Sequence, residues 1–313
     1  MSSESFVGID VSKDHLDVHV RPAGTARRFA NTDAGLRQLA KFLTPIAPTL
    51  VVLEATGGYS RAVVAALAAD RVPVVVLNPA RAREFANALG RLAKTDAVDA
   101  AVLAEYADRI RPTPRPLPDA DTLRLQALVA RRRQVVEMRA MESNRADPAS
   151  DRAVKRSLSA VARALDKELE RLDRDLAAAV EASPAWREKD ELLRSIPGIG
   201  PVVSRTLLAD LPELGTLTRE QVAALVGVAP ANRDSGRHTG RRSVRGGRAS
   251  VRAAVYMGAM SARLHNPALK AFADRLAKAG KAGKAIITAV ARKLVVIANA
   301  VLQKKSPWQP QVA

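Results

Sequence analysis

The stretch "SFVGIDVSKDHLDVHVRP", residues 5–22, contains two runs of strand-forming residues separated by a short polar turn. The first run, "SFVGIDVS", is mostly apolar. The second, "HLDVHVRP", alternates apolar and polar side chains with a period of two, as a half-buried strand does. The following "ARRFAN", residues 26–31, completes a predicted three-stranded meander. This segment therefore predicts the antiparallel part of a sheet.

Helix and strand signals alternate through the rest of the first hundred residues. The pattern predicts helices at 32–43, 58–70, 79–89 and 94–110 and strands at 49–56 and 71–78, with Pro79 opening the third helix. A meander followed by such strand–helix units predicts an α/β fold for residues 1–110, in which helices flank a mixed sheet.

Residues 111–190 are interpreted as a linker and two long helices. Four prolines exclude a helix or a central strand at the linker: Pro112, Pro114, Pro116 and Pro118. Helical patterns then cover 120–146 and 149–182. The second helix is charged except for an apolar stripe at spacings of three and four residues: Val154, Leu158, Val161, Leu165, Leu169, Leu172, Leu176 and Val180. Such a stripe fits a helical hairpin within one chain and a coiled coil between subunits equally well.

Residues 191–313 predict a mostly helical domain. Its "PGIG", residues 197–200, lies between two helical patterns and resembles a helix-hairpin-helix element, whose glycines let backbone N–H groups approach a phosphate. An ordinary glycine-containing turn is the alternative. Further helices are expected near 249–264, 266–279 and 283–304.

The net charge of +18 is concentrated in the last third of the chain. Residues 1–100 carry 12 basic and 10 acidic side chains, residues 101–200 carry 19 and 17, and residues 201–313 carry 19 and 5. A basic excess confined to one region indicates a polyanionic partner. Nucleic acid fits better than an anionic membrane, because no basic amphipathic helix is available to insert.

The composition excludes several classes of protein. The chain has no cysteine, which excludes disulfides, cysteine-ligated zinc and thiol catalysis. The N-terminal "MSSESFVGID" lacks a signal-peptide pattern, and no apolar run is expected to reach membrane-spanning length. We therefore expect a soluble cytoplasmic protein with no membrane partner.

Four acidic residues are placed in a way that solubility does not require. Asp10 lies inside an apolar strand, and Glu54 ends a second strand. Asp96 and Asp99 are three residues apart and share one face of a helix. Clustered carboxylates repel one another unless divalent cations compensate, and oxygen ligands suit Mg²⁺ or Mn²⁺. If they converge, these acids predict a metal site that polarises a phosphate.

Each of these acids also has a plainer interpretation. Asp99 fits a solvated helix position, Asp96 with Thr95 fits a helix cap, and Glu54 fits a cap for the next helix. The "GIDVS" around Asp10 also resembles the first phosphate loop of actin-like ATPases. The remaining acids at turns and exposed positions are interpreted as structural: Asp14, Asp17, Asp33 and Asp70.

The stretch "NRDSGRHTGRRSVRGGR", residues 232–248, places Ser235 among cations. Seven arginines between 231 and 252 are candidates for binding nucleic-acid phosphates: Arg233, Arg237, Arg241, Arg242, Arg245, Arg248 and Arg252. A serine beside glycine in a basic loop is ordinarily a turn residue or a neutral phosphate donor, and as a nucleophile it needs a base or a metal. His238 is a candidate base, and contact with nucleic acid or solvent is the alternative.

Six motifs in order carry a family resemblance: "GIDVSKDHLDV", "LEATGGY", "KTDAVDAAVLA", "IPGIGPVVSRTLLADL", "LVGVAPANRDSG" and "GRASVRAAVYMGAM". Together they resemble the DEDD transposases of insertion sequences, the IS110 family, which are relatives of a bacterial DNA invertase. The resemblance runs from Phe6 to about Val301 and is weakest across 110–190.

The resemblance implies a ribonuclease H-like N-terminal domain, similar to Holliday-junction resolvases, with the D-E-D-D acids at Asp10, Glu54, Asp96 and Asp99. It implies a C-terminal transposase domain whose nucleophilic serine is Ser235, joined to a DNA phosphate while strands are cut and rejoined. It also implies a non-coding bridge RNA that pairs with target and donor DNA. The family forms homo-oligomers, here expected to be a dimer or tetramer, in which one subunit's acids meet another's serine.

We therefore expect a metal-dependent, RNA-guided DNA transposase or recombinase of the bacterial cytosol. One alternative is a metal-dependent, structure-selective endonuclease that uses water. The other is a non-catalytic nucleic-acid-binding protein. A phosphoserine link separates the recombinase from the nuclease, because such a link conserves bond energy and lets strands rejoin without ATP.

Overall fold

The computed structural model describes residues 4–56, 58–91, 96–114, 119–231, 234–235, 238–239 and 243–310. For residues 96–98, 234–235 and 238–239 it describes the backbone alone. The chain forms two compact units, Met1–Leu117 and Pro118–Ala313. The predicted segment 111–190 thus contains the boundary between them, and its two long helices belong to the second unit.

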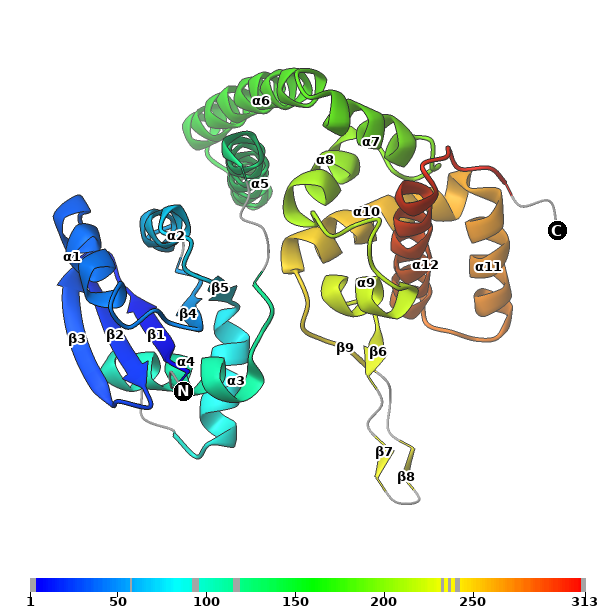
Figure 1. The fold of residues 1–313 in the computed structure, drawn as a ribbon. Coiled ribbons are helices and arrows are strands. Elements are labelled where there is room, and N and C mark those ends of the chain that lie inside the picture. The colour runs from blue at the N-terminus through cyan, green and yellow to red at the C-terminus, as the bar shows by residue number, and fades with distance from the viewer. Residues whose placement is uncertain are drawn as a thin grey trace. The chain divides into compact units, whose positions relative to one another are not determined.

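A five-stranded mixed sheet forms the centre of the N-terminal unit (Figure 1). Its strands lie in the order β3-β2-β1-β4-β5, with β1 antiparallel to β2 and parallel to β4. The elements are β1 (Phe6–Val11), β2 (His15–Arg21), β3 (Thr25–Ala30), α1 (Asp33–Leu43), β4 (Leu50–Glu54), α2 (Ser60–Ala69), β5 (Val74–Leu77), α3 (Pro79–Ala88) and α4 (Asp96–Ile110). The predicted meander and the mixed sheet flanked by helices are confirmed.

Alternating side chains along each strand build a separate core on each face of the sheet. Ile9 and Leu53 pack on one face with α1 and α2. Phe6 and Val52 pack on the other face with α3 and α4. Every second residue of β1 and β4 therefore faces α4.

Helix α4 lies directly on β1 because Gly8 has no side chain. A Cβ atom at Gly8 would lie 2.1 Å from the carbonyl oxygen of Ala100 and 2.3 Å from the backbone nitrogen of Ala104. Both contacts are with helix backbone, which cannot give way without displacing the helix. Gly8 thus sets the separation between β1 and the helix that carries Asp96 and Asp99.

We expect Gly8→Ala to destabilise the protein by about 3 kcal/mol, because overpacking against backbone forces α4 away from the sheet. Denaturant unfolding followed by circular dichroism measures this change in the free energy of unfolding. Gly283→Ala is the matched control, since a Cβ atom at Gly283 meets nothing within 4 Å. Equal stability of the two variants would contradict the close packing of α4 on β1.

The C-terminal unit is mostly helical, as predicted. Its helices are α5 (Ala120–Ala146), α6 (Arg152–Glu181), α7 (Pro184–Arg194), α8 (Pro201–Asp210), α9 (Arg219–Val226), α10 (Ala249–His265), α11 (Pro267–Lys278) and α12 (Gly283–Lys304). Between α9 and α10, the residues that the structure describes form two-residue strands: β6 (Pro230–Ala231), β7 (Asp234–Ser235), β8 (His238–Thr239) and β9 (Ser243–Val244).

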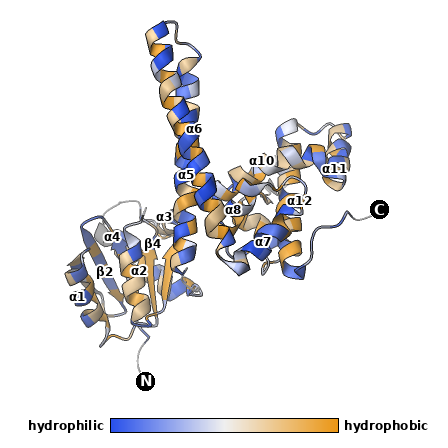
Figure 2. Cartoon of the chain, turned by 90° about the horizontal axis from the view of Figure 1, so that it is seen from above, coloured by the Kyte–Doolittle hydropathy of each residue, from blue (hydrophilic) through white to orange (hydrophobic). Residues whose placement is uncertain are grey.

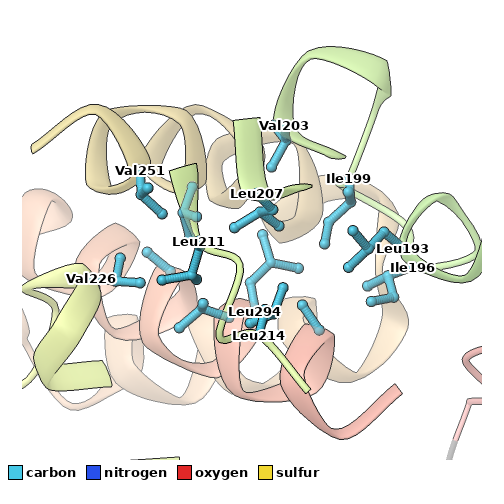
Figure 3. Packing of buried hydrophobic residues seen from close by; sticks show 14 of the residues in the cluster. Leu193, Ile196, Ile199, Val203, Leu207, Leu211, Leu214, Val226, Val251 and Leu294 are labelled. Carbon is cyan, nitrogen blue, oxygen red and sulfur yellow. The ribbon is translucent and has the colours of Figure 1, made fainter. Parts of the chain in front are cut away.

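Helices α7 to α12 share one aliphatic core (Figure 3). Leu193, Leu207, Val251 and Leu294 point toward one another from four different helices. Helix α12 is long and apolar enough, by length and composition, to cross a membrane, so the expectation that no apolar run reaches that length was wrong. Half of its apolar window is buried in this core, and that packing accounts for the composition of the helix.

Helices α5 and α6 form a hairpin whose base belongs to the same core. Leu125 and Leu176 are buried with the C-terminal helices. Val154 and Val161, nearer the start of α6, are 49% and 43% exposed, and apolar residues recur along the helix in Figure 2. The apolar stripe is therefore buried within the chain at the C-terminal end of α6, whereas Val154 and Val161 toward its start are exposed. Its use as an oligomer seam stays a prediction.

The predicted turn between two helices is present, since "PGIG", residues 197–200, joins α7 to α8. Gly198 has a φ of +105°, and a Cβ atom there would lie 2.4 Å from the Cβ atom of Ala262 in α10. The turn is therefore pressed against α10, which gives this glycine a packing role. Phosphate binding by the turn stays a prediction.

Candidate functional site

One row of residues crosses the N-terminal sheet on the side that faces α4. Asp10 on β1 pairs with Asp17 on β2, and Asp17 pairs with Arg28 on β3. On the other side of β1, Ile9 pairs with Leu53, so Asp10 and Glu54 occupy the next positions at the ends of two adjacent parallel strands. Since Gly8 and Val52 face α4 two residues earlier, Asp10 and Glu54 face the same way.

Helix α4 runs antiparallel to β1, so the first turn of the helix lies at the end of the sheet where Asp10 and Glu54 lie. Phe6 packs in one cluster with Tyr106 and Ala107, whereas Gly8 lies beneath Ala100 and Ala104. Continuing in this direction brings Asp10 toward the start of α4, where Asp96 and Asp99 lie. The structure thus brings four sequence-predicted acids to one end of the sheet.

The acids supply oxygen donors, which suit Mg²⁺ or Mn²⁺. Asp10, Glu54 and Asp99 are each partly buried, so their oxygens are neither sealed in the core nor spread over a solvated surface. Among the side chains that the structure describes, no three acids or histidines come close enough to hold one ion. The side chain of Asp96 lies outside that description. The chemistry of the donor set suits a divalent cation, and the described acids do not by themselves form a site for one.

The buried carboxylate of Glu105 pairs with an arginine of α4 itself and with an arginine shortly after α3. Glu105 is 4% exposed and accepts a hydrogen bond of 3.0 Å from Arg91. It also pairs with Arg109 at 2.6 Å. Buried charges require such partners. Because Arg91 lies shortly after the end of α3, this contact ties the end of α3 to α4.

Asp17 lies next to Asp10 in the row of residues that crosses the sheet, which we call the acid row. In the sequence it stands at a polar position of an alternating strand, and this position indicated a structural role. Its carboxylate is 13% exposed and accepts hydrogen bonds of 2.8 and 3.0 Å from Nε and Nη2 of Arg28. The short turn between β1 and β2 fixes the register that places Asp17 opposite Asp10. That turn length was the signal in the sequence that could have revealed the pairing.

Ser235 lies on an arm of the C-terminal unit that comprises the short strands β6, β7, β8 and β9. At the base of the arm β6 pairs with β9, and toward its tip β7 pairs with β8 (Figure 1). The register places Ser235 opposite His238, and only the backbone of these two residues is described. Four of the predicted nucleic-acid-binding arginines lie outside the described residues: Arg233, Arg237, Arg241 and Arg242.

Two of the predicted phosphate-binding arginines make contacts inside the protein, at the base of the arm. Arg248 donates to both carboxylate oxygens of Glu213, at 2.6 and 2.7 Å, and to the carbonyl oxygen of Asp210 at 2.9 Å. Arg252 donates to the carbonyl oxygen of Gly246. Arg245, by contrast, is exposed. Arg248 and Arg252 therefore anchor the arm, and contact with nucleic acid is a better role for Arg245.

A second basic surface covers α11, α12 and the turn between them. It comprises Lys270, Arg275, Lys278, Lys281, Lys284 and Lys293, all exposed. Two of these cations lie over the Phe272 ring, with the Arg275 guanidinium carbon 5.4 Å and Lys293 Nζ 4.4 Å from its centroid. A polyanion can bind such a surface without displacing internal ion pairs.

Comparison with known proteins identifies relatives over nearly the whole chain. A family model for IS110-type DEDD transposases, described as "Transposase", matches residues 7–149. A second, described as "Transposase IS116/IS110/IS902 family", matches residues 190–274. The pilin gene-inverting proteins of Moraxella bovis and Moraxella lacunata are each 27% identical over 321 residues, covering 99% of this chain and 99% of their own length. The first matched segment contains the four acids, and the second contains Ser235.

Proposed function

Because the chain belongs to the IS110-type transposases, we propose that it cuts and rejoins DNA through a covalent bond between Ser235 and a DNA phosphate, assisted by Mg²⁺ or Mn²⁺ and guided by a bridge RNA. Membership of a transposase and recombinase family makes DNA recombination the general activity. The observation that supports the detailed proposal is that Asp10, Glu54 and the first turn of α4 lie at the same end of the sheet.

In this proposal Ser235 supplies the nucleophile, and the four acids at the end of the sheet supply the ligands for a metal ion. In the proposed reaction Ser235 Oγ forms a bond to phosphorus while one bond between that phosphorus and a DNA oxygen breaks. The serine proton passes to solvent or to a neighbouring base, and the cleaved strand ends in a hydroxyl. Rejoining reverses the exchange, so the strand is restored without water or ATP. A divalent ion held by Asp10, Glu54, Asp96 and Asp99 would supply positive charge at the phosphate.

The basic surfaces of the C-terminal unit support nucleic acid as the partner. The arm carries Ser235, Arg245 directly follows its last strand, and the lysines of α11 and α12 form a separate surface in the same unit. We assign the arm to the scissile DNA, because it holds the nucleophile. Guanidinium groups near Ser235 would neutralise charge on the pentavalent transition state.

The exposed valines of the α6 stripe, Val154 and Val161, support an oligomer, which we take to be a dimer or tetramer. In that assembly the acids of one subunit meet the serine of another. The order of the sheet, with three antiparallel strands followed by two parallel ones and helices on both faces, supports a ribonuclease H-like N-terminal domain. The family suits a protein of the bacterial cytosol.

Hydrolysis by a structure-selective nuclease is the competing function. A metal ion held by the acids of the N-terminal unit would assist attack by water on the phosphate as well as attack by serine. Sequencing the RNA that copurifies with the expressed protein tests the guided recombinase. We expect one discrete, structured RNA whose loops match the recombined DNA. A random sample of host RNA would contradict guidance and leave the nuclease as the better account.

A further inference from the structure

A shallow groove lies beside the acid row on the face of the sheet that carries α4. Its volume is about 220 Å³, and Asp17, His19, Ala26, Arg28 and Ala100 line it. It borders the candidate site on two sides, because Asp17 pairs with Asp10 and Ala100 directly follows Asp99. β3 is the edge strand of the sheet, so the groove lies between the acids and the sheet edge.

The groove contains a cation whose orientation is fixed. Arg28 donates from Nε and Nη2 to the two carboxylate oxygens of Asp17, a bidentate geometry that holds the guanidinium plane in one orientation. The Arg28 side chain is 54% exposed, whereas that of Asp17 is 13% exposed. Since both oxygens of Asp17 accept from Arg28, Asp17 acts as a positioning residue rather than as a ligand for a metal.

The neighbouring imidazole adds a neutral hydrogen-bonding group. Burial lowers the pKa of His19 below its ordinary value, and the charges of Arg21 and Arg91 lower it further. His19 pairs with Gly8 on β1 and Ala26 on β3, which places it in the same groove two residues from Asp17. The groove thus offers a fixed guanidinium and a neutral imidazole.

We propose that this groove binds the sugar–phosphate backbone of the DNA strand next to the scissile phosphate, with Arg28 as the contact and Asp17 as the residue that positions it. The inference rests on the proposed function, because it takes the acids as the place of cutting. Arg28 lies two strands from Asp10, about 10 Å at the usual strand spacing. That span suits a phosphate one or two nucleotides from the one that is cut.

The test compares Arg28→Ala, Arg28→Lys and Asp17→Asn with wild type on supercoiled plasmid DNA, in the presence of Mg²⁺ and the copurifying RNA. We expect Arg28→Ala to raise KM for DNA about tenfold, the loss of one charge-assisted phosphate contact, with kcat changed less than twofold. The slope of log Kd against log salt, for a labelled duplex, should become shallower by about one. Lysine keeps the positive charge but lacks the planar guanidinium that donates two hydrogen bonds at once. Arg28→Lys should therefore bind DNA more tightly than Arg28→Ala and less tightly than wild type. Asp17→Asn should fall between the alanine variant and wild type.

Arg37→Ala is the matched control, because it removes the same charge from an exposed position of α1 on the opposite face of the sheet. Equal behaviour of Arg28→Ala and Arg37→Ala would overturn the proposal. If Arg28→Ala does not fold, an unchanged KM in both Arg28→Lys and Asp17→Asn would overturn it instead. The duplex-binding assay needs no cleavage, so it distinguishes failure of this contact from failure of the proposed function, which would show as absent cleavage in wild type.

Discussion

We expect Ser235→Ala to abolish strand joining and the covalent protein–DNA species, lowering the rate of recombination by roughly a thousandfold or more. The reason is that the alanine side chain has no oxygen to bond to phosphorus, so the covalent link that conserves the phosphodiester energy cannot form. The measurement is a recombination assay with plasmid substrates, followed by denaturing electrophoresis that detects protein attached to DNA.

Ser243→Ala is the control for this result. Ser243 lies on β9 of the same arm and is exposed, so the substitution makes the same chemical change without touching the proposed nucleophile. It should recombine DNA at close to the wild-type rate. Joining that survives in Ser235→Ala would show that water or another residue attacks, and the nuclease would become the better account.

The second large effect is expected at the acid end of the sheet. Asp10→Asn should lower the rate of cleavage by about three orders of magnitude while leaving DNA affinity within about twofold of wild type. The amide keeps the shape of the side chain but removes the charge that would hold a divalent ion, and such an ion stabilises the transition state by several kcal/mol. Single-turnover cleavage and equilibrium DNA binding, measured on the same preparation, separate the two quantities.

Asp33→Asn is the matched variant, because Asp33 is an exposed acid in the first turn of α1. It should cleave DNA normally. Chelation of divalent metal should reduce the wild type to the rate of Asp10→Asn. Full activity after chelation would contradict the metal site, and equal loss of binding and cleavage in Asp10→Asn would favour a non-catalytic binding protein.

The sequence predicted most of the fold because its signals are local. The alternation in "HLDVHVRP" and the apolar run before Asp10 placed both strands of the first hairpin within a residue or two. The spacing of leucines and valines placed α6 equally well. Periods of 2 and 3.6 residues in the apolar positions mark the side of a strand or helix that faces a core, and the structure buries apolar residues of these segments.

The contacts that sequence patterns could not supply are those that join distant residues. In the sequence Arg248 cannot be distinguished from the neighbouring arginines that were predicted to bind phosphates. Only the fold brings Glu213 to it across 35 positions of the chain. Asp17 was interpreted as structural because it alternates with valines and leucines, and the pairing with Asp10 depends on the register across a turn. The acids themselves were predicted to converge, and the direction of α4 over Gly8 brings the start of that helix to the end of the sheet where Asp10 and Glu54 lie. Their convergence on one ion stays a prediction.

The central claim, that Ser235 is the nucleophile, is tested most directly by trapping the protein on a nicked or mismatched DNA substrate and digesting the adduct with a protease. Mass spectrometry of the peptide that retains a nucleotide then locates the bond. We predict a single phosphodiester on the Ser235 side chain, present with Mg²⁺ and absent after chelation. A nucleotide attached to any other residue, or no adduct while cleavage proceeds, would contradict it.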